Sequence, residues 1–318
     1  MKGVQLVLVL GGATFVGGFL YFFHKRRSRR RSLRELSKPP KDNWQYVGTL
    51  EEIIMYPIKS CGGIELQEVL CEKSGIKFGH LKDRQFILVN EDDKPMFAGA
   101  QPEMLKIKPK LINDDEIEVT APGMDPLILN VHQLSEGRKE VIKAFGKSST
   151  RLVECDSYFG NWFSKFLFKK ETAVKLFMMS NNLKNILFRK NWKPNPYMVL
   201  VNESIMDLKD RLPNTIHHWQ FRGNFVINNS QLPAFSEDSW KWMRIGNEAI
   251  FQYKAPCYRC ILVNVDPFTA ERSPDFEPLR TLKKYRMKPG QIEPEMGIYF
   301  NLYKEGSVKL GDEVFVVI

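Results

Sequence analysis

Two cysteines three residues apart, Cys257 and Cys260, stand between two runs of apolar and β-branched residues. Residues 249–251 precede them and residues 261–265 follow, so the pattern predicts a strand, a tight turn that carries the thiols, and a second strand. Arg259 lies between the thiols, and a neighbouring guanidinium favours the charged thiolate. Because thiolates bind soft metals, the stretch predicts a metal-binding cysteine on a rigid β platform.

Three other interpretations of these cysteines stay open. A structural zinc site usually takes four protein ligands, but Cys61, Cys71 and Cys155 are not paired at metal-site spacing. A thioredoxin-like redox pair would open a helix, whereas residues 263–267 predict a strand and then a turn. Two inert cysteines in the core are also possible, since free cysteine is often buried.

The rest of the chain favours a mainly β fold with some α structure. Short alternating runs recur between residues 94 and 129, separated by Pro, Gly and Asn-Asp, which predicts antiparallel strands. We expect further strands at 47–58, 84–89, 173–179, 197–201, 219–227 and 296–301. Apolar residues at helical spacing predict an amphipathic helix over 156–170, and we expect shorter helices at 202–212 and 280–286.

The N-terminus predicts a membrane anchor. Residues 4–23 are uncharged and mostly apolar, which is long enough to cross a bilayer as a helix. A cleaved secretory signal would carry its positive charge first, but here the basic run follows the apolar segment. We therefore expect a transmembrane signal anchor at 1–23 and a basic linker at 24–46, with the body on the cytosolic side.

Charge and cysteine usage narrow the classes of protein. Residues 24–38 hold eight Lys or Arg and one Glu, a net +7 of the chain's formal +10, so only +3 remains for everything else. A mildly basic body gives little support to nucleic-acid binding. Five cysteines without regular spacing indicate a reducing compartment and no disulfide framework.

Three polar motifs lie on or beside predicted strands. Lys59 and Ser60 follow the first strand in a glycine-containing turn, which can direct N–H groups, a cation and a hydroxyl at an anion. Arg222 and Asn224 lie two residues apart on a predicted strand and hence on one face of it. An exposed hairpin turn and a solvated surface strand are the alternatives, and Asp83-Arg84 could be a local ion pair that contributes little.

Taken together, YPIKSC, KDR, FRGN and PCYRC resemble, in this order, the motifs of the mitochondrial amidoxime reducing component family, whose members carry MOSC domains. The resemblance covers residues 47–318 and implies a MOSC N-terminal-like β-barrel domain at 47–172 and a MOSC domain at 173–318. The chain departs from the family's pattern at Phe86, where Trp is expected, and at Gly223, where Pro is expected.

The resemblance implies a molybdenum–molybdopterin cofactor. Cys260 would be the molybdenum ligand and the catalytic residue, and the cofactor contacts would come from Lys59, Ser60, Arg84, Asn195, Arg222, Asn224, Arg259 and Tyr299.

The implied activity is reduction of amidoximes, hydroxylamines and N-oxides to amidines and amines, with electrons from NADH through cytochrome b5 reductase and cytochrome b5. The implied location is the mitochondrial outer membrane, with the endoplasmic reticulum or peroxisomal membrane as alternatives. A cofactor carrier or a sulfur-transfer MOSC protein is the alternative function.

Overall fold

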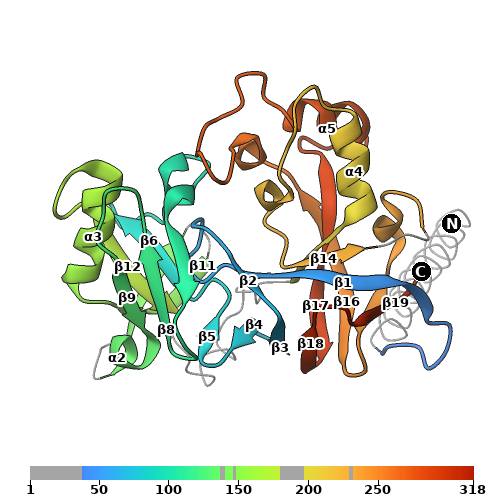
Figure 1. The fold of residues 1–318 in the computed structure, drawn as a ribbon, viewed down its shortest axis with the longest axis horizontal. Coiled ribbons are helices and arrows are strands. Elements are labelled where there is room, and N and C mark those ends of the chain that lie inside the picture. The colour runs from blue at the N-terminus through green and yellow to red at the C-terminus, as the bar shows by residue number, and fades with distance from the viewer. Residues whose placement is uncertain (1–37, 137–139, 146–147, 180–196, 229–231) are drawn as a thin grey trace, which may run out of the picture. The chain divides into compact units, whose positions relative to one another are not determined.

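The computed structural model describes residues 38–136, 140–145, 148–179, 197–228 and 232–318 (Figure 1). Strands dominate these residues, so the predicted mainly β fold class is confirmed. Four α-helices occur among them: α2 (Val131–Ser135), α3 (Ser157–Phe168), α4 (Asn202–Asp210) and α5 (Leu279–Tyr285).

The largest sheet has eight strands in the order β14-β13-β17-β16-β15-β19-β1-β2. Because β1 also pairs with β14, seven of these strands close into a ring. Aromatic rings fill its core; Tyr197 stacks on Phe225 and meets Phe251 edge-on. The strands are β1 (Gln45–Met55), β2 (Ile64–Leu66), β13 (Tyr197–Val201), β14 (Phe225–Asn228), β15 (Trp242–Ile245), β16 (Ala249–Tyr258), β17 (Glu295–Lys304) and β19 (Glu313–Val317).

Three smaller sheets complete the body, in the orders β10-β11-β12-β6, β18-β3-β4-β5 and β7-β8-β9. Their strands are β3 (Glu68–Glu72), β4 (Gly75–Phe78), β5 (Leu81–Lys82), β6 (Phe86–Asn90), β7 (Lys108–Leu111), β8 (Glu116–Thr120), β9 (Leu127–Asn130), β10 (Glu140–Phe145), β11 (Ser148–Glu154), β12 (Val174–Met179) and β18 (Gly306–Lys309).

Strand pairing crosses the domain boundary expected at residues 172/173 in both directions. Strand β1, the long blue arrow in Figure 1, pairs with β14 and β19 of the C-terminal half. Strand β12 follows the expected boundary but pairs with β6 and β11. The two halves of the sequence therefore share strands, and the loops that leave β1 reach the C-terminal barrel directly.

Helix α3 lies where aromatic residues at helical spacing predicted a helix. Asp156 caps it by accepting a hydrogen bond from the backbone N–H of Tyr158 at 3.0 Å. Gly160 allows the helix to contact β12, because a Cβ there would lie 2.4 Å from the carbonyl oxygen of Val174. Phe163 is fully buried in this contact layer. The aromatic stripe of the helix is therefore core.

Two of the predicted strands are wrong. Residues 261–265 do not form the strand expected after the cysteines, because the N–H groups of Val263 and Val265 bond to carbonyls two or three residues back and make the 3₁₀ helix Ile261–Asn264. Arg222 and Asn224 do not lie on a strand either. Arg222 ends the 3₁₀ helix His218–Phe221 in the left-handed region (φ 54°), and β14 begins only at Phe225.

Among the residues that the structure describes, no helix combines the length and the apolar character needed to cross a membrane. The expected anchor at 1–23, and the expected linker as far as residue 37, lie outside those residues.

Candidate functional site

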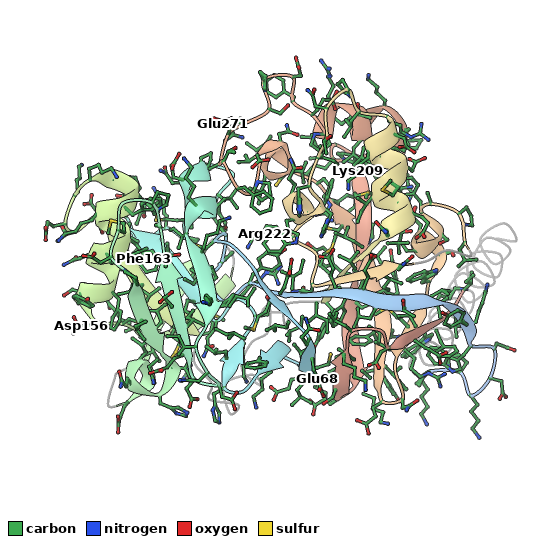
Figure 2. All side chains as sticks on the ribbon, in the orientation of Figure 1. Glu68, Asp156, Phe163, Lys209, Arg222 and Glu271 are labelled. Carbon is green, nitrogen blue, oxygen red and sulfur yellow. The ribbon has the colours of Figure 1, made fainter. Side chains whose placement is uncertain are left out.

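Arg222 is the centre of the candidate site, and Figure 2 labels it between the N-terminal and C-terminal strands. Its guanidinium carbon lies 4.1 Å from the ring centroid of Tyr56, a cation–π distance. Its Nη1 donates to the backbone carbonyl of Cys61 at 2.8 Å. Its Nη2 is buried and has no hydrogen-bond partner among the described residues. A buried guanidinium N–H without an acceptor is costly, so this position suits an incoming anion.

Arg84 reaches the other side of the same tyrosine ring system. Its guanidinium carbon lies 5.7 Å from the Tyr56 centroid, and its Nη1 lies 3.5 Å from Asn224 Oδ1. It forms an ion pair with Asp83, whose side chain is only 2% exposed. Asp83 Oδ1 also accepts the N–H of Tyr56 at 2.8 Å. Asp83-Arg84 is therefore a buried pair that fixes the loop, and the interpretation as a minor surface pair is wrong.

Lys59 and Ser60 lie on the loop that leaves β1. The loop is held against β6, because Lys59 N–H donates to the carbonyl of Phe86 at 2.9 Å. Lys59 Nζ lies 4.6 Å from the ring centroid of Phe97. Ser60 is buried, with a positive φ of 70°. The predicted turn is thus a buried loop beside the start of β6, and the exposed-hairpin alternative does not hold.

The cations of this cluster disfavour one another. Burial lowers the pKa of Lys59, and the nearby charge of Arg84 lowers it further. Burial also lowers the pKa of Arg222, with Arg84 again adding to the effect. Burial acts in the same direction on Arg84, but Asp83 outweighs it and the pKa of Arg84 is raised. One carboxylate thus faces three cations, and a bound anion would relieve the imbalance.

Asn224 is buried between strands, and backbone groups occupy its amide. Its Nδ2 donates to the carbonyl of Ile54 at 3.1 Å, and its Oδ1 accepts the N–H of Met198 at 3.2 Å. Its own N–H donates to the carbonyl of Met198 at 2.7 Å. Asn224 therefore ties β1 to β13 beneath the site, and Arg84 is the site cation that its Oδ1 approaches. The surface-strand alternative does not hold for it.

Arg259 is 6% exposed and uses its guanidinium on backbone carbonyls. Nη1 donates to the carbonyl of Phe221 at 2.7 Å, while Nε and Nη2 donate to the carbonyl of Met296 at 2.8 and 2.6 Å. Phe221 directly precedes Arg222, and Arg259 directly precedes Cys260. Arg259 therefore holds the cysteine turn against the segment that carries Arg222.

Cys260 is exposed, whereas the other four cysteines are buried. Cys257 lies within β16 and is 2% exposed. The two thiols of the motif are thus divided into a core residue and an accessible residue. An accessible thiol at the end of a fixed strand can bind a metal or a sulfur ligand.

Tyr299 lies on β17 opposite Ala255 of β16. Burial raises the pKa of its hydroxyl to about 12, with a smaller contribution from Cys257. Arg84 and Arg259 act on it electrostatically in the opposite direction, so Tyr299 lies within reach of the cation cluster. Asn195, the remaining expected cofactor contact, lies outside the described residues.

Sequence reasoning missed two residues that organise the site. Tyr56 is 1% exposed and provides the ring between Arg84 and Arg222. Asp83 connects the loop of Arg84 to the loop of Tyr56. The signal was available, since an aromatic residue directly precedes the Pro-x-Lys-Ser turn and a carboxylate directly precedes Arg84. What the sequence did not show is that these two local motifs meet.

A cavity of about 420 Å³ lies among the residues Lys106, Lys108, Thr120, Ala121, Pro122 and Phe268. Lys108 connects it to the cluster, because Arg222 contributes to lowering the pKa of Lys108, after the larger effect of burial. Lys108 Nζ donates to the carbonyl of Pro267 at 2.8 Å and lies 5.1 Å from the Phe268 ring centroid. The cavity therefore has a basic and aromatic wall.

Comparison with known proteins defines the class. The MOSC N-terminal beta barrel domain matches residues 47–170, and the MOSC domain matches residues 190–315. Mitochondrial amidoxime reducing component 2 of Bos taurus is 34% identical, over 86% of this chain and 84% of that protein. Its Homo sapiens counterpart is 32% identical, over 85% and 84%. Component 1 of Homo sapiens is 29% identical, over 86% and 84%.

These matches define a protein with a MOSC N-terminal domain and a MOSC domain. At this identity and coverage, the chain belongs to the mitochondrial amidoxime reducing component family. The resemblance predicted from the four ordered motifs is confirmed.

Proposed function

We propose that the chain is a molybdenum-cofactor-dependent reductase of N-hydroxylated compounds, which converts amidoximes, hydroxylamines and N-oxides to amidines and amines. The names of its relatives support reduction of amidoximes. The observation that carries the proposal is the unpartnered, buried Nη2 of Arg222 within a cluster of three cations. Such a cluster fits an anionic cofactor better than a neutral ligand.

The donor set fits molybdopterin, which combines a phosphate, a polar heterocycle and a dithiolene. Lys59, Arg84 and Arg222 would hold the anionic part, with the Ser60 hydroxyl as a further donor. Cys260 would supply an accessible thiolate to molybdenum. When bound, this cofactor would supply a two-electron redox centre at which the oxygen of the N-hydroxylated substrate is removed as water.

The chain's own residues would set the geometry of this reaction. Arg259 keeps the Cys260 turn beside the Arg222 segment through its bonds to the carbonyls of Phe221 and Met296. Tyr299 keeps its hydroxyl proton at neutral pH, because burial raises its pKa to about 12. Its Oη would therefore act as a hydrogen-bond donor. Removal of oxygen as water consumes two protons and two electrons, so a proton source near the substrate is required.

We extend the proposal to the electron source and the membrane. The sequence has no glycine-rich dinucleotide fingerprint at a strand–helix junction, so NADH would deliver electrons through cytochrome b5 reductase and cytochrome b5. Residues 1–23 would anchor the chain once in the mitochondrial outer membrane, with the body facing the cytosol. The word "mitochondrial" in the relatives' names supports this location over the endoplasmic reticulum or peroxisomal alternatives.

The test is the molybdenum and pterin content of the full chain, purified in detergent from a host that makes molybdopterin. We expect about one molybdenum per chain, in proportion to the single exposed cysteine, and its loss in Cys260→Ser. Cys257→Ser is the matched control from the same motif and should keep the metal. Molybdenum-free wild-type protein, or equal metal in Cys260→Ser, would overturn the assignment.

The exposure of Cys260 also suits the alternative function, because an accessible thiol can carry a sulfur atom as a persulfide. Turnover separates the two. A reductase converts an amidoxime when NADH, cytochrome b5 reductase and cytochrome b5 are present. A carrier or sulfur-transfer protein would retain the cofactor, or show a persulfide on Cys260 by mass spectrometry, without that turnover.

A further inference from the structure

His80, Asp115 and His132 form a second cluster of potential ligands, from three different segments. His80 Nδ1 lies 2.6 Å from Asp115 Oδ1, and His132 Nε2 lies 3.0 Å from the same oxygen. The two imidazole rings meet edge-on, with centroids 4.7 Å apart. One ligand atom from each residue lies within 4.8 Å of the other two. The two histidines are 58% and 62% exposed, so an ion can enter from solvent.

Backbone contacts place the three ligands. His80 N–H donates to the carbonyl of Asp114 at 2.8 Å, which fixes the turn between β4 and β5 against the turn between β7 and β8. Gly79 makes this approach possible, because its φ is +54° and a Cβ there would lie 2.5 Å from atoms of Asp114. The carbonyl of Asp115 accepts the N–H of Val131 at 3.0 Å, which brings the start of α2 beside it.

Two asparagines support the ligand-bearing segments. Asn113 Oδ1 accepts the N–H of Asp115 at 2.9 Å. Asn130 Oδ1 caps α2 by accepting the N–H of His132 at 3.0 Å, and its Nδ2 donates to Glu116. Hydrogen bonds from Asn113 and Asn130 occupy the Glu116 carboxylate, so Asp115 is the carboxylate aimed at the histidines.

We propose that His80, Asp115 and His132 bind a divalent transition-metal cation of the zinc type. Two imidazoles and one carboxylate are ligands that Zn²⁺ accepts, and three protein ligands leave a coordination position for water. With metal–ligand bonds near 2.0–2.1 Å, tetrahedral ligand atoms lie about 3.3 Å apart, so small rotations of exposed side chains bring the three atoms to that spacing. The site is separate from the Cys260 site, because none of its ligands contacts the cation cluster of Lys59, Arg84 and Arg222 in the printed hydrogen bonds and ion pairs of the described residues.

The ion would connect two sheets. His80 follows β4, which belongs to the sheet β18-β3-β4-β5, whereas Asp115 and His132 flank strands of the sheet β7-β8-β9. These connections rest on short turns, and a shared ion restrains turns that side-chain hydrogen bonds alone restrain weakly. The bound ion therefore stabilises the N-terminal half of the body without taking part in chemistry at Cys260.

Isothermal titration of zinc into the cofactor-loaded full chain, stripped of loosely bound metal with EDTA, tests the site. We expect one more zinc per wild-type chain than per His80→Ala/His132→Ala chain. Each single variant and Asp115→Asn should weaken the binding at least about tenfold, the effect of losing one ligand. Asp114→Asn, an exposed carboxylate one residue away, is the matched control and should bind as wild type does.

Two further readouts are independent of activity. Zinc should raise the unfolding temperature of wild type and of Asp114→Asn but not of the double histidine variant. Copper(II) bound to wild type should show electron-paramagnetic hyperfine coupling to two imidazole nitrogens, and to one in His132→Ala. Equal zinc uptake and affinity in wild type and the double variant would overturn the proposal, and circular dichroism checks that both are folded.

Discussion

Replacing Arg259 with methionine separates a structural role from a cofactor-binding role. Three N–H groups of Arg259 serve two buried carbonyls, those of Phe221 and Met296. Losing charge-assisted bonds to a buried carbonyl costs about 1.5–2.5 kcal/mol once the unpaired acceptor is included. Two carbonyls therefore give a loss of about 3–5 kcal/mol in the free energy of unfolding. Methionine keeps most of the buried apolar volume, so this loss reflects polar contacts.

The assay is urea unfolding of the full chain with and without cofactor, the second form purified from a host that makes no molybdopterin. The Arg259→Met loss should be the same in both forms, because its bonds are within the protein. Arg222→Met is the matched comparison. Without cofactor it should cost less than about 1 kcal/mol, because removing an unpartnered buried donor offsets the lost bond to Cys61. With cofactor present it should cost the stabilisation that binding provides.

The opposite pattern would refute the reasoning. If cofactor-free Arg259→Met unfolds within about 1 kcal/mol of wild type while the loaded protein loses its cofactor, Arg259 is a cofactor ligand and not a brace. Arg259→Lys adds a second check. One ammonium cannot reach both carbonyls as the planar guanidinium does, so this variant should recover only part of the loss.

Three further predictions follow from single contacts. Cys260→Ala should abolish amidoxime turnover and leave the unfolding free energy nearly unchanged, because the side chain is exposed; wild-type-like turnover would contradict the ligand assignment. Tyr56→Phe should change stability by less than about 1 kcal/mol, because its buried hydroxyl has no partner among the described residues, whereas Tyr56→Leu should weaken cofactor retention by losing the ring beside Arg84 and Arg222. Burial raises the pKa of Glu237 to about 7, so its contribution to stability is full below about pH 4.5 and is lost as the pH rises through 7, by about 3 kcal/mol in total; denaturation at pH 5 and pH 8 should show this slope in wild type and not in Glu237→Gln.

Local patterns predicted the elements that depend on local physics. Helix α3 was predicted because aromatic residues at a spacing of three and four must share a face, and Asp156 marks its start. The alternating runs predicted β7, β8 and β9 because one face of each strand is buried. Cys260 was singled out by its motif, and the structure makes it the accessible thiol of the five.

The roles of charged residues could not be predicted in this way, because they depend on partners far along the chain. Arg222 and Arg259 look alike in sequence, each a cation in a short polar motif. The structure gives Arg259 two carbonyl partners, 37 and 38 residues away, and leaves one donor of Arg222 without a partner among the described residues. The same difference explains Asn224, whose amide bonds to Ile54, 170 residues away. Only long-range pairing decides which cation is structural and which is available to a ligand.

Backbone conformation gives an independent argument for where the site lies. Ser60, Arg84 and Arg222 all have positive φ, of 70°, 54° and 54°. Each such residue costs about 1 kcal/mol, and glycine would adopt the conformation without that cost. Glycine would also remove a hydroxyl or a guanidinium from the cluster. Three strained polar residues from three separate loops converge beside Tyr56, where a stability argument alone would place none. The strain is therefore best explained by an anion that these side chains hold together.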